Sequence, residues 1–219
     1  MARDDNVLAI DTASSSPAVA LLARGQIFEE TLAPDRRASE ELLPAIRRCL
    51  SSAGLSIGEL SLLAVCAGPG SFTGIRVGLA TAWGLARAAG VPVETVSTLE
   101  AIAEASRDGE ASGVWAAVDA GRGDVAVQPF RLSPGRAEPR GELRLVAGER
   151  AARLAAGEPL VAARGDRVPG AGPPLAITPA RAVATAAARE PRGAAVSPAR
   201  PLRAVYARPS AAEEKHGAA

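Results

Sequence analysis

The sequence predicts an α/β protein of two domains, of which the second is the shorter. Three observations predict this class. Apolar strands come before any helix, helices and strands then alternate as far as residue 105, and a second pair of strands begins near residue 114. Strands that alternate with helices build a parallel sheet with crossover connections. The hydrophobic fraction is 47% but aromatic residues make up only 3%, so we expect a core of Ala, Val, Leu and Ile.

The chain is expected to open with three strands. Residues 7–12 form an apolar run that ends in a polar turn, and residues 17–23 form a second run. Gly25 then leads into a third run at 26–32. The second and third strands are therefore predicted to form a hairpin at 23–25.

A helix is expected next, over residues 39–53. Ser39 is a suitable N-cap, and the acidic residues that follow it suit the positive end of the helix dipole. Gly54 should end the helix, and Pro44 should kink it because proline removes a backbone donor. The apolar residues of this segment have helical spacing; they are Leu42, Leu43, Ile46, Cys49, Leu50 and Ala53.

The alternation then continues to residue 105. The expected elements are a strand at 62–66, a helix at 73–89, a strand at 91–96 and a helix at 99–105. Three strands followed by this alternation are typical of the actin-like ATPase fold, also called the ASKHA or ribonuclease H-like fold. In that fold an antiparallel meander continues into a parallel sheet.

The second half opens like the first but soon loses its pattern. Strands are predicted at 114–119 and 125–130, joined by a turn at 121–123. Beyond residue 133 a strand at 159–163 and helices at 148–156 and 179–189 are expected. We therefore divide the chain into an N-terminal domain (1–107), a shortened C-terminal domain (108–208) and a disordered tail (209–219).

Charge and cysteine usage exclude several classes of protein. The 25 basic and 24 acidic residues nearly cancel, so no overall field attracts nucleic acid. No apolar run approaches the ~18 residues of a membrane helix, and no leader is evident at the N-terminus. Cys49 and Cys66 lie in apolar stretches without metal or redox spacing. We expect them to be buried reduced thiols in a cytoplasmic protein.

The turn after the first strand has two interpretations. Asp11 and Thr12 stand where actin-like kinases wrap nucleotide phosphates, with an acidic residue at the metal. A phosphate-binding turn usually needs glycines, because backbone N–H groups must approach the phosphate oxygens. Residues 13–17 contain none, and Pro17 has no N–H to donate. We favour an Asx-type turn that fixes the strand end.

The glycine-rich loop at 68–78 also has two interpretations. It resembles a phosphate site at a helix N-terminus, but it lacks the Lys-Ser/Thr pair of a Walker loop. Its small residues recur every fourth position and form a stripe on the predicted helix, made of Gly74, Gly78, Ala82, Ala86 and Gly90. Such a stripe allows close packing, either against the sheet or against another subunit. Trp83, in a neighbouring row, is either core or an interface anchor.

The sequence offers few catalytic groups. The single histidine, His216, lies in the tail, so neither a histidine metal site nor a Ser-His-Asp triad is expected. Asp119 and Asp124 bracket a turn and could face a cleft between domains, but we favour a hairpin turn with solvated acids. We predict no catalytic residue, no metal and no cofactor.

Several segments together resemble the TsaB (YeaZ) family. They are 7–12, 39–44, 68–78, 97–101, 117–120, 123–125 and 201–206. Within the loop, the family pattern includes Gly68, Gly70, Ser71 and Thr73, and we assign these residues, with Asp11 and Thr12, structural roles.

The resemblance implies an accessory subunit for making threonylcarbamoyladenosine at the tRNA adenosine beside the anticodon. Family members have the actin-like fold, form a heterodimer with the catalytic subunit TsaD, and are joined by the ATPase TsaE. They do not catalyse the transfer themselves, and tRNA is met through the complex. Two other functions remain open: an active small-molecule kinase with the same fold and, less favoured, a metallopeptidase.

We predict that the helices at 39–53 and 73–89 form the face that binds TsaD. The same face could support a homodimer when the chain is alone. The residues assigned to this face are an apolar set and a small-residue set with one tryptophan: Leu42, Leu43, Ile46, Cys49, Gly74, Gly78, Ala82 and Trp83.

Overall fold

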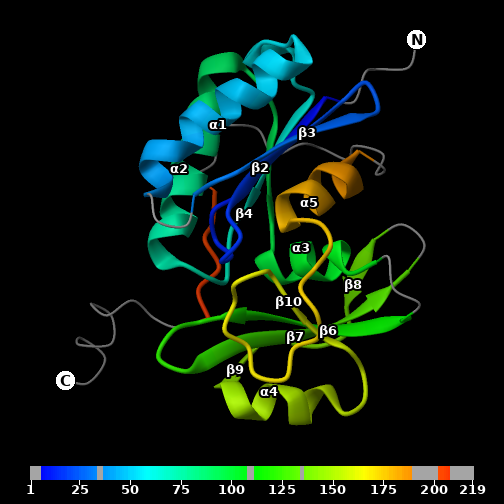
Figure 1. Ribbon diagram of the computed structural model, residues 1–219. Helices are drawn as coiled ribbons and strands as arrows, with labels where there is room; N and C mark the ends of the chain where they lie inside the picture. Colours follow the sequence, from blue (N-terminus) through cyan, green and yellow to red (C-terminus); the bar gives the residue numbers. More distant parts are fainter. Residues whose placement is uncertain (1–5, 34–36, 108–110, 134–135, 189–201, 208–219) are drawn as a thin grey trace, which may run out of the picture.

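Two five-stranded sheets form the framework of the protein in a computed structural model (Figure 1). The structure describes residues 6–33, 37–107, 111–133, 136–188 and 202–207. The tail predicted at 209–219 lies outside the described residues. The predicted α/β class is confirmed, and the core consists mainly of Ala, Val, Leu and Ile as expected. No helix within the described ranges has both the length and the apolar character needed to cross a membrane.

The first sheet has the strand order β3-β2-β1-β4-β5. Its strands are β1 (Val7–Asp11), β2 (Ala18–Ala23), β3 (Gln26–Thr31), β4 (Leu62–Cys66) and β5 (Val93–Val96). The first three strands are antiparallel, and β4 and β5 run parallel to β1. This is the predicted meander followed by a parallel sheet. The predicted hairpin is confirmed, with Arg24 and Gly25 at its turn.

Helices cover both faces of this sheet (Figure 1). On one face lie α1 (Ala38–Ala53) and α2 (Phe72–Ala89). On the other lies α5 (Pro179–Ala187), and α3 (Thr98–Ala105) packs between α5 and the strands of the second sheet. A short 3-10 helix, η1 (Ile57–Glu59), precedes β4. Gly54 and Gly90 end α1 and α2 in the left-handed conformation that glycine adopts readily.

The predicted N-cap of the first helix is wrong. Arg37 occupies that position without a side-chain hydrogen bond to the helix, and Ser39 lies inside the first turn. Glu40 and Glu41 remain in the first turn, where their charge suits the helix dipole. Pro44 lies within the helix, which continues through it to Ala53.

The second sheet has the order β10-β6-β7-β8, with β9 also paired to β7. Its strands are β6 (Gly113–Asp119), β7 (Asp124–Leu132), β8 (Ala137–Pro139), β9 (Arg144–Ala147) and β10 (Leu160–Ala162), and α4 (Gly148–Ala155) packs against it. The strands β8 and β9 were not predicted. Each is only three or four residues long, and they pair with opposite ends of the long strand β7.

The second half of the chain also contributes to the first core. Ala180, Val183 and Ala184 of α5 belong to the core of the first sheet, and α5 also packs along α3. In the sequence, the predicted boundary between residues 107 and 108 falls after the last strand of the first sheet and before the first strand of the second. The division into domains stays a prediction.

Candidate functional site

The glycine-rich loop packs directly onto the turn that follows β1. Gly70 has a backbone φ of 147°, which residues other than glycine rarely adopt. A Cβ atom at this position would also clash with the Ala13 carbonyl oxygen. The Ser71 N–H donates to the same carbonyl at 2.8 Å. Ser71 also caps α2, because its Oγ accepts the Gly74 N–H at 3.1 Å. The N–H groups of Ser71 and Gly74 are therefore used within the chain.

The stripe of small residues on α2 faces this turn and the sheet. A Cβ atom on Gly74 would overlap the Thr12 carbonyl oxygen, and one on Gly78 would lie 2.5 Å from Thr12 Oγ1 and 3.4 Å from Val65. Thr12 Oγ1 donates to the Gly74 carbonyl at 2.7 Å. Of the two partners considered for the stripe, the chain's own sheet is the one it contacts.

Six of the eight residues predicted for a partner face are buried inside the chain, and that part of the prediction is wrong. They are Leu42, Ile46, Cys49, Gly74, Gly78 and Ala82. Burial and the nearby charge of Glu30 raise the pKa of the Cys49 thiol to about 12. Of the eight, Leu43 and Trp83 are exposed, by 52% and 41%. Helical spacing showed which residues share a face but not what covers that face.

Asp11 forms the Asx-type turn favoured from the sequence. Its carboxylate is fully buried and accepts the N–H groups of Ala13 at 2.9 Å and Ser14 at 3.1 Å, and the Ser14 hydroxyl at 2.5 Å. Burial raises the pKa of this carboxyl, and the bonds from Ser14 and Ala13 oppose that change. The adjacent Cys66 thiol is also buried, and its pKa is raised well above the usual value by burial and by Asp11. The carboxylate holds the turn together.

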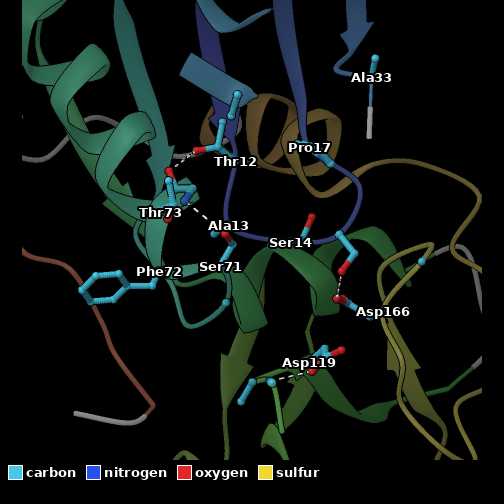
Figure 2. Close-up of a pocket in the computed structure, with 17 residues that line it drawn as sticks. Thr12, Ala13, Ser14, Pro17, Ala33, Ser71, Phe72, Thr73, Asp119 and Asp166 are labelled. Atoms are coloured by element: carbon cyan, nitrogen blue, oxygen red, sulfur yellow. Dashed lines mark hydrogen bonds between the residues drawn. The ribbon is translucent and has the colours of Figure 1, made fainter. Parts of the chain in front are cut away.

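A cleft of about 790 Å³ lies in front of this turn (Figure 2). One wall comes from the β1–β2 turn and the start of α2, and the other from the second sheet and the loop after β10. Its polar lining residues are hydroxyls and acids: Thr12, Ser14, Ser15, Ser71, Thr73, Asp119 and Asp166. Among the residues that the structure describes, no group of three or more His, Cys, Asp or Glu side chains is placed to hold a metal ion.

Two acids from the second half line this cleft. Asp119 ends β6, and its Oδ1 accepts the Gly121 N–H at 2.7 Å, so it shapes the predicted hairpin turn while also reaching the cleft. The N–H of Asp124 closes that turn onto the Gly121 carbonyl at 3.1 Å. Asp166 was not among the predicted site residues, because it lies in a Pro- and Gly-rich stretch without periodicity. Its Oδ1 accepts the Ser15 hydroxyl at 2.6 Å.

Comparison with known proteins places the chain in a family. A family model described as "TsaD: tRNA N6-adenosine threonylcarbamoyltransferase" matches residues 31–154, more than half of the chain. The TsaB proteins of Haemophilus influenzae and Escherichia coli, each named "tRNA threonylcarbamoyladenosine biosynthesis protein TsaB", are 40% and 39% identical over 120 residues. These matches span 54% of this chain and about half of each relative, 51% and 52%.

A solved structure described as YeaZ from Pseudomonas aeruginosa is 33% identical, with a TM-score of 0.62. The match covers 67% of this chain and 69% of that one. This chain belongs to the TsaB (YeaZ) family. A second solved structure, described as an uncharacterized protein with similarity to peptidase YeaZ from Pseudomonas aeruginosa, is 29% identical with a TM-score of 0.77, and the match covers 93% of this chain and all of that one. The resemblance to TsaB and the actin-like fold are thus confirmed.

The glycine-rich loop and the last segment of the TsaB-like pattern meet in the structure. The Val205 N–H donates to the Ala67 carbonyl at 2.7 Å, so residues 202–207 run beside the glycine-rich loop. Tyr206 packs on Phe72 with ring centroids 5.2 Å apart, and the Arg76 guanidinium lies 3.8 Å from the centre of the Phe72 ring. Figure 2 shows Phe72 pointing away from Asp119 and Asp166 toward this segment. The matching segments near residues 70 and 205 therefore form one structural unit.

Proposed function

We propose that this chain is a non-catalytic subunit in the synthesis of tRNA threonylcarbamoyladenosine, and that it acts by binding a TsaD-type catalytic subunit. TsaE joins the pair, and tRNA is reached through the complex. The names of the TsaB relatives support the pathway. The use of the glycine loop for internal packing supports a role without catalysis in this subunit.

One observation carries the choice of docking surface. Leu43 of α1 and Trp83 of α2 are large apolar side chains left exposed on two helices that lie side by side (Figure 1). The Arg87 guanidinium lies 5.5 Å from the centre of the Trp83 ring, so the tryptophan carries a cation on its face. Exposed tryptophan and arginine are the residue types that most often dominate the energy of protein interfaces. We therefore assign TsaD binding to the exposed face of α1 and α2.

The test is co-purification with the TsaD of the same host. Leu43→Glu and Trp83→Glu each place a charge in the proposed interface without touching the core, because both side chains are already exposed. We expect each variant to weaken the affinity for TsaD at least about 10-fold, the effect of losing an interface anchor. Threonylcarbamoyladenosine formation by the reconstituted proteins, measured by mass spectrometry of tRNA nucleosides, should fall with binding.

The matched control is Leu145→Glu. Leu145 is 36% exposed but lies on β9 of the second sheet, away from α1 and α2. This variant should bind TsaD like the wild type. If Leu43→Glu and Trp83→Glu bind TsaD as tightly as the wild type, the assignment of the interface is refuted. Failure of the wild-type chain to bind TsaD would refute the proposed function itself.

A further inference from the structure

The cleft is bridged at one end by contacts between segments 150 residues apart. The Ser15 hydroxyl, in the β1–β2 turn, donates to Asp166 Oδ1 at 2.6 Å. The neighbouring Ser16 hydroxyl donates to the Arg164 carbonyl oxygen. Between these two bonds, a Cβ atom on Gly165 would lie 3.3 Å from the Ser15 carbonyl oxygen, so the backbones are in close contact. In Figure 2 a dashed line joins Asp166, on the loop after β10, to a side chain of the β1–β2 turn.

We propose that the Ser15–Asp166 contact is a pH-sensitive latch that holds the loop after β10 against the β1–β2 turn and keeps this end of the cleft closed. The latch belongs to the isolated chain and does not depend on the proposed partner. Its two sides come from different sheets, so opening it requires only that the loop at 163–166 moves away from the turn at 14–16.

The surroundings of Asp166 favour a neutral carboxyl in the closed state. Oδ2 is buried and accepts no hydrogen bond from the residues that the structure describes. The charged groups acting on Asp166 are Asp11, at the end of β1, and Asp119, at the end of β6, and both repel a carboxylate. Arg164, on the same loop, is exposed to solvent.

Protonation of Asp166 is therefore linked to closure. Burial raises the pKa of Asp166, and the charges of Asp11 and Asp119 raise it further. Hydrogen bonding from Ser15 and from the Asp119 backbone opposes this, and the pKa is about 6 against the ordinary 3.8. In an open state the carboxyl is hydrated and its pKa returns toward the ordinary value. Ionisation then favours opening by about 100-fold, the ratio that corresponds to a difference of about two pKa units. The latch is therefore closed in acid and loosens progressively as the pH rises from about 4 to about 6.

Hydrogen exchange of the full chain tests this proposal. After correction for the intrinsic exchange rate, backbone amides in 14–16 and 163–168 should exchange up to about 50-fold faster at pH 7.5 than at pH 4, with most of the change between about pH 4 and pH 6. Amides in the middle of β1 and β4 serve as internal controls and should not follow this profile. Protection at 163–168 that is independent of pH in the wild type would overturn the proposal.

Two variants separate the latch from a general change in stability. Asp166→Asn keeps an oxygen that can accept the Ser15 hydroxyl but cannot ionise, so the protection of 163–168 should be high and independent of pH. An unchanged pH profile in this variant would show that another group is responsible. Ser15→Ala removes the bond and should leave 163–168 poorly protected at both pH values.

The carboxyl titration of Asp166 in Ser15→Ala, followed by NMR, gives a second and independent result. If the latch opens, the carboxyl becomes hydrated and its pKa falls toward 3.8. If the loop stays in place without the serine, the carboxylate loses a hydrogen bond while remaining buried, and its pKa rises above 6. The second outcome contradicts the proposal, and it does so even if Asp166→Asn fails to fold.

Discussion

A hydrogen bond joins Thr12, directly after β1, to Gly74 in the first turn of α2. Thr12 Oγ1 donates to the Gly74 carbonyl, and the Thr12 carbonyl lies where a side chain on residue 74 would begin. The strand end and the helix start are thereby held in direct backbone contact. Residue 74 of α2 must consequently be glycine, which gives a measurable prediction.

Gly74→Ala is expected to destabilise the protein by about 2–4 kcal/mol, because the added methyl group meets backbone atoms that cannot move aside cheaply. Gly84→Ala is the matched control on the same helix. No atom lies within 4 Å of a Cβ at Gly84, so this change should stabilise the protein by about 0.5–1 kcal/mol through helix propensity. Urea unfolding measures both free energies, and equal effects of the two changes would refute this account of the stripe.

Asp166 should make stability depend on pH. Its folded pKa, about 6, lies above the ordinary 3.8, so its contribution to stability is present below 3.8 and is lost as the pH rises to 6. The free energy of unfolding of Asp166→Asn, minus that of the wild type, should therefore be about 1–3 kcal/mol larger at pH 7.5 than at pH 4. Unfolding in urea at the two pH values gives this difference, and Glu138→Gln on β8 serves as an exposed control. A variant that is less stable at pH 7.5 than at pH 4, relative to the wild type, would contradict the assignment.

The packing of Tyr206 on Phe72 should hold residues 202–207 against the first sheet. Tyr206→Ala removes the ring and should destabilise the protein by about 1–2 kcal/mol, because roughly this much is lost with a half-exposed aromatic contact. Tyr206→Phe keeps the ring and loses only the long bond of 3.4 Å between the hydroxyl and Arg76 Nε. Its effect should stay below about 0.5 kcal/mol. Thermal unfolding distinguishes the ring from the hydroxyl.

ATP with magnesium should bind the isolated chain weakly and without turnover. The Ser71 N–H already donates to the Ala13 carbonyl and the Gly74 N–H to Ser71 Oγ, so neither is free to bind phosphate. Asp11 already accepts three hydrogen bonds that hold its own turn. Calorimetric titration measures the affinity. Micromolar binding with release of phosphate would favour the kinase alternative over an accessory subunit.

Much of the fold could be predicted because its signals are local. Continuous apolar runs marked the buried strands, and glycines marked the ends of α1 and α2. Local sequence patterns do not reveal a strand that forms only because a neighbouring strand pairs with it. β8 and β9 have only three and four residues, too few to show alternation, and they form because β7 is long enough to pair with both.

The candidate site was harder to predict because its parts come from distant segments. Periodicity identified the small stripe of α2, but only the packing shows that Thr12 and Val65 cover it. Asp166 meets Ser15 across 151 positions, and nothing near either residue in the sequence indicates that contact. The exposed Trp83 was left undecided between core and interface for the same reason, since the burial of a helical face depends on the whole fold.

The position of α5 has a consequence for synthesis on the ribosome. This helix covers one face of the first sheet, yet it is translated after the whole second sheet. At typical rates of about 5–20 residues per second, the strands β1 and β2 wait on the order of 10 s before α5 emerges. During that interval the nascent chain presents an uncovered apolar sheet face, which makes it a substrate for chaperones that bind such surfaces.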